Sequence, residues 1–172
     1  YQWQSSTTSS TSGFNNITGA TNSTYDAPIG LNLTTYYQVI TTSTLNGNSC
    51  QTTSNVITIS INNVSAGTVS GNQTLCLGAD PASFSVVAAA TGSGTVSYQW
   101  QSSLTSSTSG FGNITGATSS AYDPPSGIQS TTYYQLLVTS TLNGVSCTAT
   151  NAPITVNVNQ VTASDISGNQ TI

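Results

Sequence analysis

The chain of 172 residues contains no lysine, arginine or histidine, and four aspartates give it a net charge of −4. General acid–base and nucleophilic catalysis normally need a histidine, a lysine or a pair of carboxylates, so the composition argues against an enzyme. Without cations the chain cannot neutralise phosphates, which excludes nucleic-acid binding. Its longest apolar runs, such as 86–90, are far shorter than the roughly 18 residues of a membrane-spanning helix, so we expect no membrane insertion.

An internal repeat organises the whole sequence. Placing Tyr98 under Tyr1 aligns the two halves without a gap at a period of 97 residues, with 48 identities in the 75 positions that can be compared. A unit of about 100 residues has the size of a two-sheet sandwich domain and is too long for a solenoid repeat. The repeat therefore predicts an all-β chain of tandem immunoglobulin-like antiparallel β-sandwiches.

The period also predicts domain boundaries. We expect the C-terminal part of one repeat at 1–62, a complete repeat at 63–159 and the N-terminal part of the next at 160–172. On this interpretation the sequence is a segment of a longer array.

Short runs with period-two alternation predict the strands of the complete repeat in chain order. Residues 83–90 correspond to the second strand of such a sandwich and 95–103 to the third, and in 83–90 the residues Phe84, Val86, Ala88 and Ala90 share one face. In 95–103 the aromatics Tyr98 and Trp100 point inward, opposite two glutamines. Residues 132–139 and the alternating stretch that starts at Ile154 complete the set.

The connections carry their own signals. Asn143-Gly144 is a strong hairpin signal because both residues tolerate positive φ, so the last two strands should be neighbours. The Ser/Thr tract 102–109 is too polar for a buried strand and predicts an exposed connection. The chain should re-enter the sheet near Phe111 and Ile114, and Tyr122 marks another expected strand.

The inward positions of these strands predict the hydrophobic core. Trp on the third strand and Tyr near the start of the sixth are features of immunoglobulin-type sandwiches. The predicted core residues are Trp3, Tyr37, Phe84, Trp100, Tyr134, Leu136, Ile154 and Val156.

Three cysteines are present, and the repeat explains the odd number. Cys76 precedes the first predicted strand and Cys147 follows the Asn-Gly turn, so we expect a disulfide between them that closes the domain. Cys50 is the copy of Cys147 and should pair with a cysteine outside the sequence. The alternative pairing of Cys50 with Cys76 across a domain boundary breaks the repeat.

Several motifs together resemble the tandem immunoglobulin-like repeats of giant surface proteins of Bacteroidetes, including gliding-motility adhesins and other substrates of the type IX secretion system. These motifs are the cysteine before the first strand, YQWQSS, NITGAT, Tyr-Asp-x-Pro, TTYYQ and the closing cysteine. The resemblance implies spacers that hold a binding tip away from the cell or pack side by side into filaments.

Two further features of the sequence are candidate sites. Asp26 and Asp123 lie near prolines at equivalent places, as at calcium-stiffened domain junctions. Calcium wants several oxygen ligands, so we expect a turn and no cofactor or metal. Outward-facing Tyr36 and Tyr133 are the candidates for surface contacts, including contacts with glycans.

The sequence therefore predicts a structural module of an extracellular filament or adhesin stalk on the cell surface. Its expected partners are neighbouring repeats of the same chain and identical chains in a fibre, and surface glycans are a further candidate. The alternative function is a carbohydrate-binding repeat array of a surface adhesin.

Overall fold

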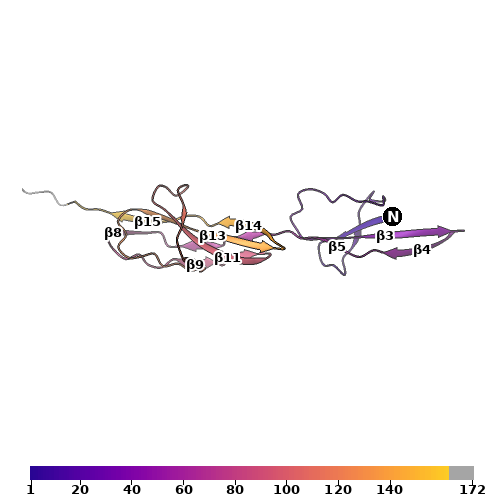
Figure 1. Cartoon of the computed structure of the whole chain (residues 1–172), viewed down its shortest axis with the longest axis horizontal. Coiled ribbons are helices and arrows are strands. Elements are labelled where there is room, and N and C mark those ends of the chain that lie inside the picture. Colours follow the sequence, from indigo (N-terminus) through magenta and orange to yellow (C-terminus); the bar gives the residue numbers. More distant parts are fainter. Residues whose placement is uncertain (163–172) are drawn as a thin grey trace, which may run out of the picture. The chain divides into compact units, whose positions relative to one another are not determined.

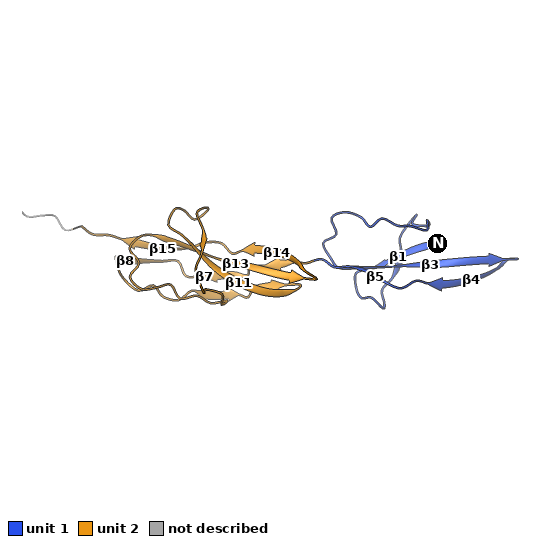
Figure 2. Ribbon diagram, in the orientation of Figure 1, with its two compact units in different colours: residues 1–61 blue, residues 62–172 orange. Residues whose placement is uncertain are grey.

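The computed structural model of the chain describes residues 1–162, and these residues form strands, turns and loops with no helix. The prediction of an all-β chain is confirmed. The chain divides into two compact units, Tyr1–Ile61 and Asn62–Ile172 (Figure 2). The predicted third segment, 160–172, lies almost wholly outside the described residues.

Unit 2 holds most of the strands, and they run along its length in Figure 1. Its strands are β6 (Val64–Ser65), β7 (Thr68–Ser70), β8 (Gln73–Cys76), β9 (Ser85–Ala88), β10 (Thr91–Gly92), β11 (Thr95–Ser103), β12 (Gly112–Asn113), β13 (Thr132–Leu142), β14 (Val145–Thr150) and β15 (Ile154–Asn159).

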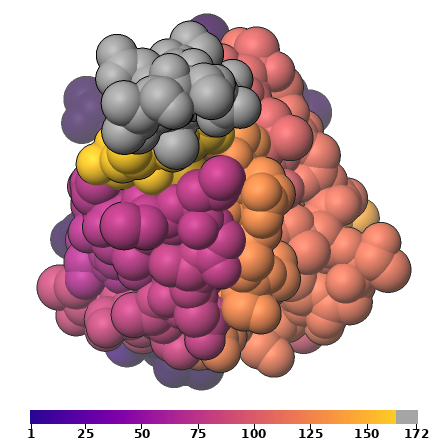
Figure 3. All heavy atoms as spheres, turned by 90° about the vertical axis from the view of Figure 1, so that its left-hand side faces the viewer, coloured from indigo at the N-terminus to yellow at the C-terminus, as the bar shows by residue number. Residues whose placement is uncertain are grey.

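One large sheet dominates unit 2. Its strand order is β12-β11-β13-β15-β8, and β14 also pairs with β13. β13 lies between β11 on one side and β14 and β15 on the other, with all of these pairs antiparallel. The edge strand β8 runs parallel to β15, a pairing that the sequence did not predict. Figure 3 looks onto the end of the unit that carries β8 and shows the segment that contains β8 packed beside the later part of the chain.

The second layer is small. It consists of β7 paired with β9 and, separately, β6 paired with β10. The predicted strand 83–90 is only partly right, because β9 is shorter and its valines are not in the core: Val86 is 43% exposed. The predicted strand at Tyr122 is wrong. Tyr122 lies in a loop whose backbone C=O accepts a hydrogen bond from the Phe84 N–H at 3.0 Å.

The core of unit 2 lies between the two layers and centres on Trp100, which is completely buried. The Phe84 ring centroid lies 5.5 Å from that of Trp100 and 5.2 Å from that of Tyr134, and Tyr122 stacks on Trp100 at 5.4 Å. Aromatic pairs at such distances contribute about 0.5–1.5 kcal/mol each beyond the area they bury. The predicted core residues Leu136, Ile154 and Val156 are each at most 2% exposed and complete the same cluster.

The Asn-Gly turn forms as predicted. Asn143 (φ 51°) and Gly144 (φ 80°) both adopt the left-handed conformation that this tight hairpin requires, and β14 returns along β13. Beyond β14 the side chain of Asn151 replaces a strand partner, since its Oδ1 accepts the Leu136 N–H at 2.6 Å. The chain then continues as β15 beside the first half of β13.

Unit 1 repeats part of this arrangement. Its sheet has the order β2-β1-β3-β4, with β5 also paired to β3. Tyr37 is buried, and Trp3 is only half-buried. Its strands are β1 (Gln2–Ser6), β2 (Asn15–Asn16), β3 (Thr35–Leu45), β4 (Asn48–Thr53) and β5 (Ile57–Ile59).

Gly94 provides a test of how closely the connection between β10 and β11 approaches the backbone of β13. A Cβ on Gly94 would lie 2.1 Å from the carbonyl oxygen of Thr141, which belongs to the backbone of β13 and cannot move away cheaply. We expect Gly94→Ala to lower the free energy of unfolding by about 1–3 kcal/mol, measured by urea denaturation. Gly112→Ala is the matched control because nothing lies within 4 Å of its Cβ, and equal effects of both substitutions would contradict this packing.

The phenol of Tyr134 makes stability depend on high pH. Burial raises its pKa to about 12, with a smaller contribution from Tyr122, although a side-chain hydrogen bond with Thr132 lowers it. Because the folded-state pKa lies above the unfolded value near 10, this contribution to stability is complete below pH 10 and is lost as the pH rises towards 12.

Urea denaturation at pH 9 and pH 11.5 measures this loss. Tyr134→Phe should lose less stability between the two pH values than the unmodified chain, whereas the half-buried Tyr133→Phe should behave like the unmodified chain. The same pH dependence in all three proteins would contradict the assignment to Tyr134.

Candidate functional site

The outer face of the large sheet carries a ladder of amide side chains. Gln135 on β13 donates from Nε2 to Gln101 Oε1 on β11 at 2.7 Å, and Gln101 donates from Nε2 to Asn113 Oδ1 on β12 at 2.8 Å. Gln101 and Gln135 lie directly opposite each other, as their register requires. The ladder links three strands and leaves the Nδ2 group of Asn113 at its exposed end.

Unit 1 builds the same ladder. Gln38 donates to Gln4 and Gln4 donates to Asn16, each at 2.8 Å. The residues of the two ladders are 97 positions apart, so the sequence repeat and the hydrogen bonds coincide. In sequence the two ladders were visible only as glutamines opposite the inward-facing aromatics, and their partners were not predicted.

The predicted contact residues lie on this same face. Tyr133 is half-buried beside the ladder, opposite Ser103 on β11 and Thr155 on β15. Tyr36 has the equivalent place in unit 1, opposite Ser6 and Thr58. A face of amides, hydroxyls and a phenol has no charge at neutral pH. Such a face can exchange hydrogen bonds with sugar hydroxyls or with another face of the same kind.

Two of the shared motifs, YQWQSS and NITGAT, form one hydrogen-bonded frame. The Trp100 N–H donates to the Ala117 C=O at 2.9 Å, and the Ile114 N–H donates to the Trp100 C=O at 2.9 Å. The indole Nε1 donates to the Ser119 C=O at 3.1 Å, and Gln99 Nε2 donates to the Ile114 C=O at 2.8 Å. YQWQSS and NITGAT therefore hold each other in place, which explains why both recur.

The frame is reproduced in unit 1 with nearly the same distances. The Trp3 N–H donates to the Ala20 C=O at 2.9 Å, and Trp3 Nε1 donates to the Asn22 C=O at 3.0 Å. The Ser/Thr loops match as well, because Ser6 Oγ and Ser103 Oγ each donate to a backbone C=O six residues later at 2.7 Å. The exposed connection predicted at 102–109 is thus an ordered loop organised by one buried serine hydroxyl.

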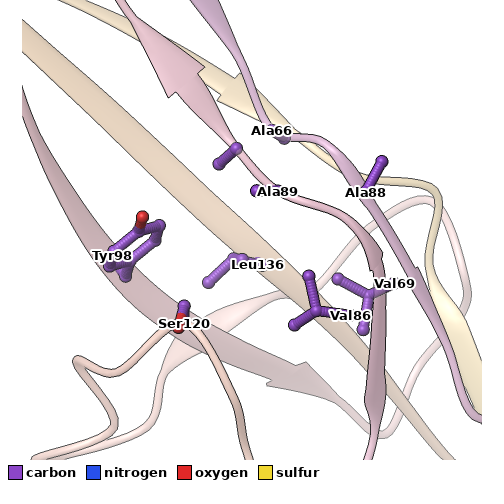
Figure 4. A pocket seen from close by; sticks show the side chains of 9 residues that line it. Ala66, Val69, Val86, Ala88, Ala89, Tyr98, Ser120 and Leu136 are labelled. Atoms are coloured by element: carbon purple, nitrogen blue, oxygen red, sulfur yellow. The ribbon is translucent and has the colours of Figure 1, made fainter.

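An apolar cavity of about 170 Å³ lies in unit 2 between β9 and the large sheet. Figure 4 shows Val69 and Val86 on one side of it and Tyr98 and Leu136 on another. Ser120 also lines it, and alanines make up most of the remaining wall. The cavity reflects the small second layer and offers few polar groups to orient a ligand.

The sequence did not predict a group of hydrogen bonds that joins Asn62 to the β13–β14 hairpin. The Nδ2 group of Asn62 donates to the Ser140 C=O at 2.7 Å and to the Val145 C=O at 2.8 Å, while Ser140 Oγ donates back to Asn62 Oδ1 at 2.7 Å. Ser140 is completely buried. The first residue of unit 2 is therefore fixed to the β13–β14 hairpin, and the only sequence signal was that both residues recur in the other copy, as Asn159 and Ser43.

The family of the chain follows from comparison with known proteins. A family described as a domain of unknown function, DUF8696, matches residues 1–63 and residues 65–160. The chain belongs to the DUF8696 family. No curated protein and no solved structure matches the chain.

The three aspartates that the structure of this DUF8696 chain describes do not form a cluster. Asp123 accepts a hydrogen bond from Ser83 Oγ at 2.8 Å, Asp26 and Asp80 are exposed, and Asp165 lies outside the described residues. Within residues 1–162 no group of three His, Cys, Asp or Glu side chains is placed to hold a metal ion. The same residues include no helix able to cross a membrane.

The predicted Cys76–Cys147 disulfide is wrong for this fold, because all three cysteines are free. Cys76 ends β8 next to the end of β15, whereas Cys147 on β14 lies opposite Ser140 near the tip of β13 (Figure 1). Thr132 lies opposite Val156, and it is eight residues along β13 from Ser140, the residue opposite Cys147. These eight residues span about 27 Å, so Cys147 is at least that far along the sheet from the end of β15 beside Cys76. A disulfide needs Cα atoms no more than about 7 Å apart.

Thiol titration tests this correction. The folded DUF8696 chain should release about three equivalents of thionitrobenzoate from Ellman's reagent, because each cysteine is free. The exposed Cys50 and Cys76 should react faster than the half-buried Cys147. A Cys50→Ser variant that titrates to no thiol and gives a 76–147 cross-linked peptide by mass spectrometry would contradict the structure.

Proposed function

We propose that the chain is a structural repeat of an extracellular filament or adhesin stalk, in which immunoglobulin-like sandwiches act as spacers and assembly units. One observation carries the proposal: the same hydrogen-bonded frame occurs twice, 97 residues apart, around Trp3 and around Trp100. A module that is copied with its internal bonds intact is the unit from which an array is built. The setting we propose is the cell surface, as in the Bacteroidetes surface proteins that the motifs resemble.

The arrangement of unit 2 supports the immunoglobulin-like assignment. Trp100 on β11 packs in the core, Tyr134 lies near the start of β13, and the two strands are neighbours in the large sheet. Strand β8, from the N-terminal part of unit 2, adds to the same sheet beside β15. Trp on the third strand and Tyr at the start of the sixth are the residues by which such sandwiches are known.

The chemistry of the chain supports a passive mechanical role. We infer no catalysis, no cofactor and no nucleic-acid partner, because the sequence lacks lysine, arginine, histidine and glutamate. We infer no membrane insertion, because the apolar runs of the sequence are far shorter than a membrane-spanning helix. Trypsin, which cleaves after lysine and arginine, has no site in it. The uncharged outer face with its amide ladder is suited to contacts with identical chains, since no charge has to be desolvated when two such faces meet.

Surface labelling and imaging test the proposal. Antibodies raised against the chain should label intact cells of the source, and the extracted full-length polypeptide should appear by electron microscopy as a beaded or helical fibre with one bead per repeat. Antibody absorbed with the chain is the control for labelling. Labelling only after permeabilisation, or compact particles of fixed size, would overturn the proposal.

A carbohydrate-binding array is the second candidate, and the position of Tyr133 beside the amide ladder favours it. Such an array should bind one glycan of a panel saturably, and Tyr133→Ala should remove the binding. Tyr98→Phe is the control because Tyr98 lies on the opposite, inward face of the sheet. No binding across the panel would leave the structural role as the only candidate.

A further inference from the structure

The apolar cavity of unit 2 is large for a module with a 97-residue period. Its volume is about 170 Å³, and protein interiors contain few voids larger than a water molecule. All the residues that line it lie between Ala66 and Leu136, inside the complete repeat 63–159. The cavity is therefore a property of one module, and its walls come from that module alone.

The cavity arises from a change in side-chain size along one segment of the second layer. Phe84 reaches across to the large sheet, where its ring centroid lies 5.5 Å from that of Trp100 and 5.2 Å from that of Tyr134. Residues 88–90 are all alanine, and they line the cavity together with Tyr98 on β11. Packed sheets lie about 10 Å apart, so a methyl side chain cannot fill the space that a phenylalanine ring fills.

The side chains that line the cavity carry only two polar groups, the hydroxyls of Tyr98 and Ser120, and none of them is charged. A buried water needs about two to four polar partners, so this wall cannot hold the several waters that the volume would admit. An engineered apolar cavity of about 150 Å³ in another protein stays dry and binds benzene or xenon. The size and the lining of the cavity both favour an apolar occupant.

The two hydroxyl-bearing residues share one side of the cavity. Figure 4 shows Tyr98 and Ser120 across from Val69 and Val86. Neither hydroxyl makes a hydrogen bond within residues 1–162, so both can bond with a ligand. Val86 lines the cavity and is still 43% exposed, so the cavity is open to solvent beside β9.

We propose that this cavity binds a small uncharged ring compound with at most one hydroxyl group, such as benzene, phenol or a cresol. The ring packs against Val69, Val86 and Leu136, and the hydroxyl of the ligand bonds with Tyr98 or Ser120. An ionised ligand is excluded, because the wall has no cation to pair with it and burial of an unpaired charge is costly. This inference concerns a ligand held inside one module and does not depend on the filament role.

Methyl NMR of the whole chain tests the site, with benzene, phenol and sodium benzoate as probes. Benzene and phenol should shift the methyl resonances of Val69 and Leu136 saturably. The methyl groups of Leu45 and Val145 should not shift, since these residues are 74% and 61% exposed and do not line the cavity. Benzoate, which has the same ring with a charge, should leave all four residues unchanged. No saturable shift with benzene or phenol, or equal shifts with benzoate, would overturn the proposal.

Two neighbouring residues of β9 provide a matched pair of variants. Val86→Phe enlarges a side chain of the cavity wall and should weaken the binding of benzene at least about 10-fold. Val87→Phe is the control, because Val87 is 67% exposed and does not line the cavity, and it should bind benzene as the unmodified chain does. If the NMR spectrum shows that Val86→Phe does not fold, Ala90→Leu fills the cavity from another position of its wall. Equal affinity in the filled and control variants would contradict the site.

The hydroxyl contacts are tested by comparing two ligands. Removal of both hydroxyls, in Tyr98→Phe combined with Ser120→Ala, should weaken the binding of phenol about 3- to 10-fold, as expected for the loss of one hydrogen bond. The binding of benzene should stay nearly unchanged, because benzene makes no such bond. Equal losses for the two ligands would show that the substitutions act through the shape of the cavity, and would overturn the assignment of the hydroxyl contacts.

Discussion

The burial of the Trp100 indole is the interaction on which the rest of unit 2 depends. Its ring fills the space between the two layers, where it contacts Phe84 and Tyr122, and no part of it is exposed. Its Nε1 group could not remain unpaired there, since an unsatisfied buried donor costs about 1–3 kcal/mol. The Ser119 C=O accepts that hydrogen bond and so draws the loop 115–122 over the core.

The features that recur in both copies follow from the need to bury the indole and to pair its Nε1 group. The loop that meets the indole is NITGAT and its continuation, and its backbone also pairs with the backbone of the tryptophan itself. Gln99 closes the same loop from the outer face, and Gln101 starts the amide ladder. One motif, YQWQSS, thus builds the core with its inward side chain and the uncharged surface with its outward ones, because successive strand residues point to opposite faces.

Unit 1 shows which of these contacts form locally and which need a second layer of strands. The frame around Trp3, the amide ladder and the serine-organised loop all form without any counterpart of β7 and β9. These contacts join strands and loops of a single sheet and its connections. The burial of Ile57 and Trp3 does not follow, because apolar side chains on the inner face leave water only when a covering layer reaches them.

The residues alone were sufficient for the all-β class, the Asn143-Gly144 hairpin, the strand 95–103 and the inward direction of Trp100. Each of these rests on local rules, namely alternation along a strand and tolerance of positive φ at a turn. Other features depend on contacts between residues that are distant in sequence, and only the tertiary structure determines them. These are the parallel pairing of β8 with β15, the hydrogen bonds from Asn62 to Ser140, and the exposure of Val86. The tertiary structure also separates Cys76 from Cys147, because the position of β8 in the sheet is fixed by pairing with β15 and not by any property of the cysteines.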